Sequence, residues 1–132
     1  MKTIQYYRLR NNNKVEGFAK EVDDTTYFKA YNEFSWHENP ILFDTIDVGL
    51  KVLDKRNRRL YTNDVILYKL LSKPSLRKGF VAYEPLRRDF GIIDLETYHF
   101  TPFFVNELAL FENDRLEVIS HLFTIKEKSN EY

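Results

Sequence analysis

The stretch from Leu53 to Tyr68 most constrains what this chain can fold into. An apolar segment ends at Leu53, a charged turn follows, and a Thr62-Asn63-Asp64 corner leads into a second apolar segment. Beyond that corner, residues 65–71 place apolar side chains on both faces of a strand. A strand of this kind is expected at the centre of a sheet or in the wall of a barrel.

Short strand-like segments alternate with turn signals along the rest of the chain. β-branched and aromatic residues predominate in these segments, as is typical of strands. The expected strands cover residues 3–9, 15–20, 27–31, 48–53, 80–83, 90–95 and 116–125, and a short apolar run lies at residues 41–43. Thr101-Pro102, followed by apolar residues at 104, 108 and 111, predicts a short helix, with a strand over residues 102–111 as the alternative.

These segments predict a mainly β fold. The expected core is a small closed or partly open β-barrel with an N-terminal β-hairpin extension and one short helix. Closing a barrel removes the exposed strand edges of an open sheet. We expect a β-rich extension over residues 1–45 that packs on the core, a barrel core over residues 46–126, and a flexible tail over residues 127–132.

The formal net charge is zero, but the charge is unevenly distributed. Residues 1–49 carry six basic and eight acidic groups, residues 50–90 eleven and four, and residues 91–132 three and eight. Complementary charges within the fold or between subunits explain this pattern, and a basic face for nucleic acid is the alternative. Without cysteine, signal peptide or an apolar run of about 20 residues, the chain is expected to be cytoplasmic and without membrane contact.

Three segments resemble the YopX family of phage and prophage proteins. Residues 49–51 and 54–66 resemble the family signature, residues 78–83 with 90–92 its middle hairpin, and residues 116–123 its closing strand. Residues 3–20 are similar in style to the N-terminal strand pair. The chain departs from the signature at Val52 and Leu53, which are extra, at Arg58 and Asn63, which replace turn glycines, and at Ser120-His121, which replace Gly-Asn.

This resemblance implies a β-barrel core, a phage or prophage origin and a tendency to self-assemble. It implies no activity. Asn63 is an acceptable replacement for a glycine, because asparagine can hold a left-handed backbone angle. Arg58 is less suited to that angle, which suggests that the two extra residues have changed the type of the turn.

No catalytic, metal-binding or cofactor-binding motif is present. The histidines are His37, His99 and His121, and none lies at metal-ligand spacing from another candidate ligand. The carboxylates Glu84, Asp89, Asp94 and Glu96 cluster in sequence, but they alternate with turn residues and are best interpreted as solvated loop charges. We therefore expect no catalytic residue, no metal and no cofactor.

Basic residues gather at three expected turns. They are Lys55, Arg56, Arg58 and Arg59 at the first turn, Arg77 and Lys78 at the second, and Arg87 and Arg88 at the third. If the three turns point the same way, they form a basic rim suited to single-stranded nucleic acid; solvated hairpin tips are the alternative. Tyr61, Asn63 and Asp64 are interpreted as a structural corner in which the carboxylate bonds the backbone two or three residues further on.

These observations lead to two hypotheses about function. The first is a non-enzymatic phage or prophage accessory protein that acts through protein–protein interaction as a homo-oligomer, or by binding a host or phage protein. The alternative is a small nucleic-acid-binding β-barrel that uses the basic hairpin tip at residues 55–59.

Overall fold

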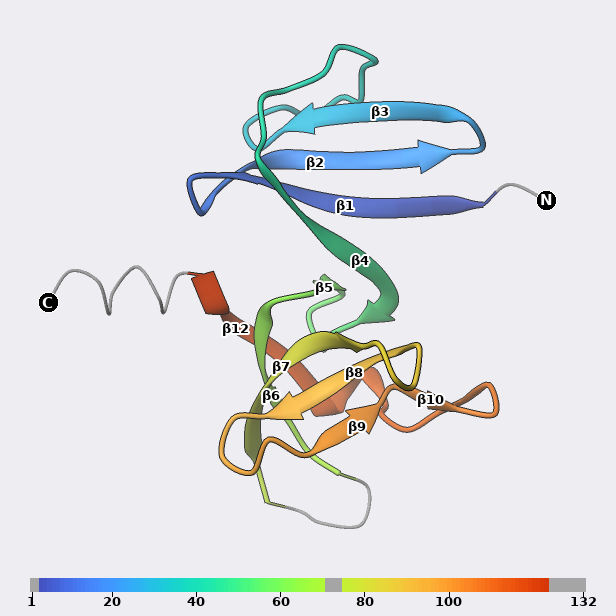
Figure 1. The fold of residues 1–132 in the computed structure, drawn as a ribbon, viewed down its shortest axis with the longest axis vertical. Helices are drawn as coiled ribbons and strands as arrows, with labels where there is room; N and C mark the ends of the chain where they lie inside the picture. Colours follow the sequence, from blue (N-terminus) through green and yellow to red (C-terminus); the bar gives the residue numbers. More distant parts are fainter. Residues whose placement is uncertain (1–2, 71–74, 124–132) are drawn as a thin grey trace, which may run out of the picture. The chain divides into compact units, whose positions relative to one another are not determined.

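The computed structural model describes residues 3–70 and 75–123, and the chain forms two compact units (Figure 1). The first unit reaches to Leu50 and the second begins at Lys51. The division lies inside strand β4 (Thr45–Leu53), which begins where the sequence suggested a boundary. The expected tail at residues 127–132 lies outside the described residues.

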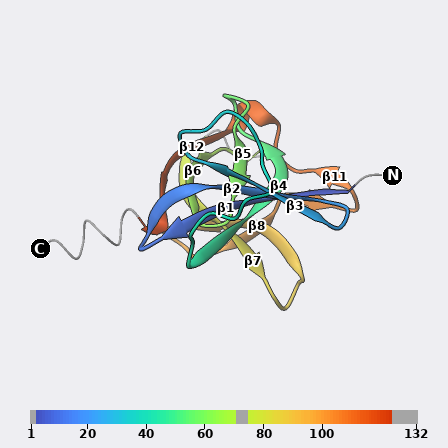
Figure 2. The ribbon, with the colours of Figure 1, turned by 90° about the horizontal axis from the view of Figure 1, so that it is seen from above.

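The first unit is an antiparallel meander (Figures 1 and 2). Its strands are β1 (Ile4–Asn11), β2 (Lys14–Val22) and β3 (Thr25–Ala30), and the first part of β4 pairs with β1. The strand order is therefore β3-β2-β1-β4. Because β1, β2 and β3 pair with their neighbours in sequence, short turns are enough to connect them.

The turns of this meander follow from its Asn and Asp residues. Asn12 and Asn13 join β1 to β2 with φ angles of 52° and 63°, and Asp23 begins the next turn with a φ of 54°. A two-residue hairpin loop needs this left-handed backbone, which asparagine and aspartate tolerate better than most residues. The structure accordingly has two-residue turns at residues 12–13 and 23–24.

The second unit is built on an open antiparallel sheet of order β12-β6-β7-β8-β9. Its strands are β6 (Asp64–Tyr68), β7 (Arg77–Glu84), β8 (Asp89–Asp94), β9 (Phe100–Pro102) and β12 (Leu116–His121). Within β6, Val65, Ile66 and Tyr68 are buried, so side chains on both faces of this strand are covered. The strand predicted to be apolar on both faces lies inside the sheet, with a neighbour on each side.

Two short β pairs complete the second unit. Strand β5 (Arg59–Tyr61) lies next to β4 in the sheet order, across the turn at residues 54–58. Strands β10 (Phe104–Val105) and β11 (Leu108–Ala109) form a separate two-stranded hairpin. A single turn of 3-10 helix, η1 (Asn113–Arg115), precedes β12.

The mainly β class is confirmed, but a closed barrel is not. The sheets of the described residues stay open, because neither order returns to its first strand. The helix predicted from Thr101 to Phe111 is wrong, and the strand alternative holds. Thr101 and Pro102 pair with β8, and Asn106 and Glu107 have φ angles of 50° and 69°, which no α-helix allows.

The final strand is shorter than expected. Strand β12 ends at His121, and residues 124 and 125 of the predicted strand lie outside the described residues. A bulge between Val118 and Ser120 shifts its pairing with β6. The bulge changes which side chains share a face, so the simple alternation read from the sequence fails there.

Candidate functional site

The basic tip, Lys55, Arg56, Arg58 and Arg59, surrounds a buried carboxylate. Asp54 is fully buried at the end of β4, where its Oδ1 accepts the backbone N–H groups of Arg56 and Arg58 at 3.0 and 2.9 Å. Its Oδ2 accepts the Nε–H of Arg58 and the backbone N–H of Val118, both at 3.0 Å. Arg58 also donates to the carbonyl of Val118 at 2.7 Å. The turn is therefore tied to β12 through Asp54 and Arg58.

Hydrogen bonding decides the charge state of Asp54. Burial raises its pKa, but the donors on Val118, Arg58 and Arg56 outweigh burial and lower the pKa below its usual value. Asp54 therefore stays ionised and holds Arg58 at 2.9 Å as an ion pair. It is a turn clamp that the sequence analysis missed, since its partners are set by the fold.

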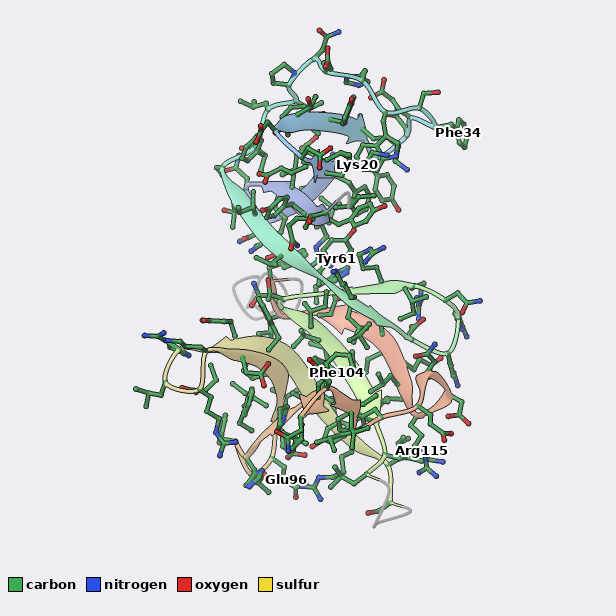
Figure 3. All side chains as sticks on the ribbon, turned by 90° about the vertical axis from the view of Figure 1, so that its right-hand side faces the viewer. Lys20, Phe34, Tyr61, Glu96, Phe104 and Arg115 are labelled. Atoms are coloured by element: carbon green, nitrogen blue, oxygen red, sulfur yellow. The ribbon has the colours of Figure 1, made fainter. Side chains whose placement is uncertain are left out.

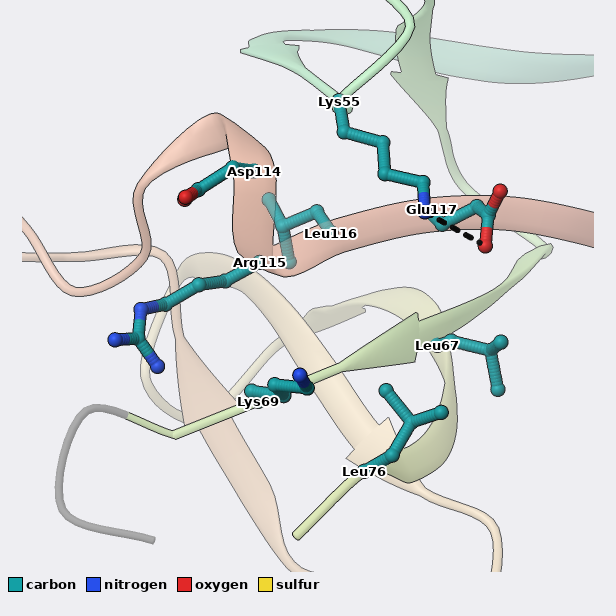
Figure 4. A pocket seen from close by; sticks show the side chains of 8 residues that line it. All are labelled: Lys55, Leu67, Lys69, Leu76, Asp114, Arg115, Leu116 and Glu117. Carbon is teal, nitrogen blue, oxygen red and sulfur yellow. Dashed lines mark ion pairs between the residues drawn. The ribbon is translucent and has the colours of Figure 1, made fainter. Parts of the chain in front are cut away.

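The two outer cations of the tip face a single acid. The Lys55 ammonium and the Arg56 guanidinium each lie 3.5 Å from the carboxylate of Glu117 on β12. Figure 4 shows Lys55 and Glu117 on one side of a shallow hollow of about 180 Å³, with Leu67 and Leu76 beside them and Lys69 and Arg115 opposite. Charge within this hollow is mixed.

The other predicted cations do not join the tip. Arg77 is paired with Asp94 at 2.6 Å, and the Arg87 guanidinium lies 5.7 Å from the centre of the Phe100 ring. Lys78 and Arg88 are exposed, and Arg88 has a φ of 52° in the turn between β7 and β8. In Figure 3 that turn and the turn at residues 54–58 lie at opposite sides of the second unit. No common basic rim forms.

A second buried carboxylate, Asp94, organises the far end of β8. Its Oδ2 accepts the Tyr68 hydroxyl at 2.5 Å and the Arg77 Nε–H at 2.6 Å. Its Oδ1 accepts the backbone N–H groups of Glu96 and Thr97 at 2.9 and 3.0 Å. These groups border an open hollow of about 340 Å³ that also includes His99.

The pKa shifts of this cluster agree with its hydrogen bonds. The bond from Arg77 holds the pKa of Asp94 well below its usual range. Burial, with the bond to Asp94, raises the pKa of Tyr68 to about 12. At neutral pH Asp94 is therefore a carboxylate and Tyr68 a neutral phenol, a combination that suits a structural bond better than proton transfer near pH 7.

At the corner formed by Tyr61, Asn63 and Asp64, the carboxylate bonds the backbone of an earlier residue. Asn63 has a φ of 73°, as expected for a residue in place of glycine. The Asp64 carboxylate accepts the backbone N–H of Tyr61 at 2.8 Å, a bond to an earlier residue that the sequence did not suggest. The predicted bond to later residues stays a prediction. Asp64 is buried because it begins the central strand β6, whose following residues continue into the core.

The histidines and acidic residues do not assemble a metal site. No group of three candidate ligands comes together within residues 3–70 and 75–123. His37 bonds Glu33 at 2.8 Å, and His121 stacks on Phe123 with ring centres 4.8 Å apart. In the same two ranges, no helix has the length and apolar character needed to cross a membrane.

The hairpin of β10 and β11, here called the apolar hairpin (residues 104–109), carries apolar side chains that are not buried. Phe104, Val105 and Leu108 are exposed by 43, 45 and 72%. At its base Phe103 and Phe111 are buried with ring centres 6.1 Å apart. Figure 1 shows the hairpin projecting from the second unit. A helix was predicted for these residues, with a strand as the alternative, and neither prediction included an exposed apolar surface.

The first unit contains a buried ionic cluster that the sequence did not reveal. Asp47 on β4 is fully buried and accepts bonds from the Nε–H of Arg8 at 2.8 Å and of Arg10 at 3.0 Å. A further Arg10 nitrogen donates to Asp47 at 3.0 Å. Arg8 and Asp47 stand opposite each other in the β1–β4 register. The i, i+2 spacing of Arg8 and Arg10 was the available signal, but their partner lies far along the chain.

The same unit brings two lysines to one tryptophan. The ammonium groups of Lys20 and Lys29 lie 4.5 and 5.0 Å from the centre of the Trp36 ring. We call Lys20, Lys29 and Trp36 the lysine–tryptophan cluster. These three residues are far enough apart in the sequence that no local pattern predicts their contact.

Three comparisons with known proteins found no match for the chain. No family model matches it, and neither does any curated protein or solved structure. The resemblance to the YopX family therefore stays a prediction that rests on the sequence motifs.

Proposed function

We propose that this protein is a non-enzymatic phage or prophage accessory protein that acts through protein–protein contact as a homo-oligomer. The sequence motifs support the phage origin and a partly open barrel core in the second unit. The apolar hairpin supports the contact. A chain without cysteine suits the cytoplasm of a host cell, where we place it.

The observation that carries this proposal is a hairpin that is apolar on both faces. Phe104 pairs with Ala109, and Val105 pairs with Leu108, so the two pairs point to opposite faces. An isolated two-stranded hairpin is marginally stable in water. Here the hairpin is held at its base by the buried rings of Phe103 and Phe111, while its own side chains stay exposed. Contiguous exposed apolar groups of this kind are typical of contact surfaces.

A second copy of this chain is the favoured partner of the apolar hairpin, because the protruding hairpin and a hollow lie side by side. An open hollow of about 220 Å³ at the base of the hairpin is lined mainly by Val52, Phe103, Phe104 and Phe111. In a twofold dimer the same patch is used by both subunits, so each can place its hairpin against the hollow of the other. A surface with a protruding hairpin next to a hollow is therefore complementary to itself.

Light scattering after size-exclusion chromatography tests this proposal with Leu108→Glu. We expect the natural protein to be a dimer at about 50 µM and the variant to be a monomer, because a carboxylate would be buried in an apolar contact. Leu86→Glu is the matched control, since Leu86 is 95% exposed in a different hairpin turn. A monomeric natural protein, or a Leu108→Glu variant that still dimerises, would contradict the proposal.

Nucleic-acid binding by the basic tip is the second candidate. The outer cations support it, because the Lys55 and Arg56 side chains are 46 and 67% exposed and share one carboxylate at 3.5 Å. Binding at the tip would weaken steeply with salt and would be lost in Lys55→Gln/Arg56→Gln. A gel shift at low salt that this double variant leaves unchanged would count against the tip.

A further inference from the structure

The lysine–tryptophan cluster is built on a cross-strand ladder. Lys20 on β2 stands between Tyr6 on β1 and Tyr27 on β3 in the strand register. The Lys20 ammonium lies 5.9 Å from the centre of the Tyr27 ring, and the Tyr6 and Trp36 ring centres are 6.4 Å apart. Side chains opposite each other in a sheet share a face. Three aromatic rings and the lysines therefore meet on one face of the first unit.

The loop that carries Trp36 is fixed to the sheet. His37 and Phe28 exchange two backbone hydrogen bonds of 2.6 and 2.9 Å, so the loop returns along the edge of β3. Glu33 accepts the backbone N–H of Ala30 at 2.8 Å and bonds His37 at the same distance. Trp36 is therefore held in place before any ligand arrives.

The positive charge of the cluster is not neutralised by a neighbouring acid. Among the described residues, no carboxylate lies within ion-pair distance of Lys20 or Lys29. Arg8 is opposite Phe18 in β2, and Phe18 is opposite Lys29 in β3, so the Arg8–Arg10–Asp47 cluster lies on the same face. That face carries the cationic side chains of Arg8, Arg10, Lys20 and Lys29, and the carboxylate of Asp47 is bonded to the two arginines, although residues 1–49 contain more acids than bases.

Partly or largely exposed rings lie on this face and in the loop that carries Trp36. Trp36, Tyr6 and Tyr27 are only partly buried, and in the same loop Tyr31 is 72% and Phe34 99% exposed. Figure 3 shows Phe34 pointing away from the unit, and Lys20 on its sheet. A fully exposed phenylalanine contributes nothing to the core. Cations for phosphates next to open rings for bases are the two elements of a surface that binds single strands.

We propose that this face of the first unit binds single-stranded nucleic acid. Lys20 and Lys29 receive backbone phosphates, and Phe34, with the open parts of Trp36 and Tyr27, stacks with bases. Duplex binds more weakly, because its bases are already stacked on each other and cannot reach the rings. The proposal concerns a different surface from the apolar hairpin and from the basic tip.

Trp36 provides a direct reporter, because it is the only tryptophan of the chain. Titration with a single-stranded oligothymidylate at low salt is expected to change the Trp36 fluorescence. Lys20→Gln/Lys29→Gln is expected to weaken binding at least tenfold and to reduce the slope of log K against log salt by about 1.4. Circular dichroism shows whether this variant keeps its fold.

Phe34→Ala keeps the test decisive if the lysine variant fails to fold. The Phe34 side chain is 99% exposed, so its loss leaves the core intact, and binding is expected to weaken about tenfold through lost stacking. The matched control is Lys78→Gln/Arg88→Gln, which removes two exposed charges that lie outside both basic surfaces and is expected to leave binding unchanged. Lys55→Gln/Arg56→Gln is measured beside it, because loss of binding in that variant would assign the nucleic acid to the basic tip. The comparison separates the two basic surfaces.

Four results would overturn the proposal. The first is the absence of a Trp36 fluorescence change with the oligonucleotide, and the second is loss of binding in the tip variant while the lysine and Phe34 variants still bind. The third is equal affinity for duplex. The fourth is full competition by inorganic phosphate at an equal concentration of phosphate groups. The last result would reduce the surface to a site for a simple anion. Binding of the single strand that is stronger than binding of duplex, and that is weakened by Phe34→Ala, supports the proposal.

Discussion

The basic tip and the lysine–tryptophan cluster are both cationic, but their charges are balanced in different ways. At the tip, Arg58 is paired with buried Asp54, and Lys55 and Arg56 share Glu117. In the cluster, Lys20 and Lys29 lie over the Trp36 ring. A ring attracts a cation without neutralising its charge. The region with the densest positive charge in the sequence is therefore not the region with the most available charge in the fold.

The carboxylates at the ends of strands explain much of this difference. Asp54 ends β4 and Asp94 ends β8, and each accepts two backbone N–H groups of the following turn with one oxygen and an arginine Nε–H with the other. This arrangement stabilises the turn and pairs the charge of one arginine with a buried carboxylate. In the first unit Asp47 accepts bonds from two arginines, and no carboxylate of residues 3–70 and 75–123 lies within ion-pair distance of the two lysines on the neighbouring strands.

The largest effect is expected for Asp47→Asn in the first unit. Loss of this carboxylate leaves two buried guanidinium groups without their counter-charge, which costs about 3–5 kcal/mol of unfolding free energy. Chemical unfolding followed by Trp36 fluorescence measures it, because Trp36 lies in the same unit. Asp44→Asn is the control, since Asp44 is exposed and bonds only the turn and Thr45. Equal stability of the two variants would show that the buried cluster contributes little.

A smaller effect is expected for Asp94→Asn in the second unit. Its pKa is lowered in the folded state by Arg77, so the stabilisation is present above the unfolded pKa of about 4 and is lost as the pH falls below it. At pH 7 the variant is expected to lose about 2–3 kcal/mol, and near pH 3 the difference shrinks. Hydrogen exchange of β6 to β8 at both pH values localises the loss.

The control for this measurement is Glu96→Gln. Glu96 contributes only its backbone N–H to Asp94, and its side chain is exposed. A pH-independent loss in Asp94→Asn would show that the carboxylate contributes through shape and not through its charge. The charge of Arg77 would then not depend on the carboxylate of Asp94, in contrast to the pairing of Arg58 with Asp54.

The sequence was sufficient for features that depend on neighbouring residues. Asn63 was recognised as a turn residue because the tolerance of a left-handed backbone angle is a property of the residue itself, and the same property suits Asn12 and Asn13 to their turn. The central position of β6 followed from apolar side chains on both of its faces. The helix prediction failed because the apolar spacing of Phe104, Leu108 and Phe111 also fits a hairpin whose tip is exposed.

The sites depended on contacts that no local pattern encodes. Asp47 meets Arg8 only through the register of β1 and β4, 39 residues apart in sequence. Lys20, Lys29 and Trp36 meet only because the loop after β3 returns along that strand. The first contact becomes visible once the order β3-β2-β1-β4 is known, and the second once the bridge between Phe28 and His37 is known as well.

The smallest effect is expected at the tip, for Lys55→Ala and Arg56→Ala. Both side chains are largely exposed and lie 3.5 Å from Glu117, so each loss is expected to change the unfolding free energy by no more than about 0.5 kcal/mol. Arg58→Ala is expected to cost more, because it breaks the bonds to Asp54 and Val118. Chemical unfolding of the three variants ranks them. If Arg56→Ala proves as costly as Arg58→Ala, the outer cations are structural too, and the tip has no charge to offer a ligand.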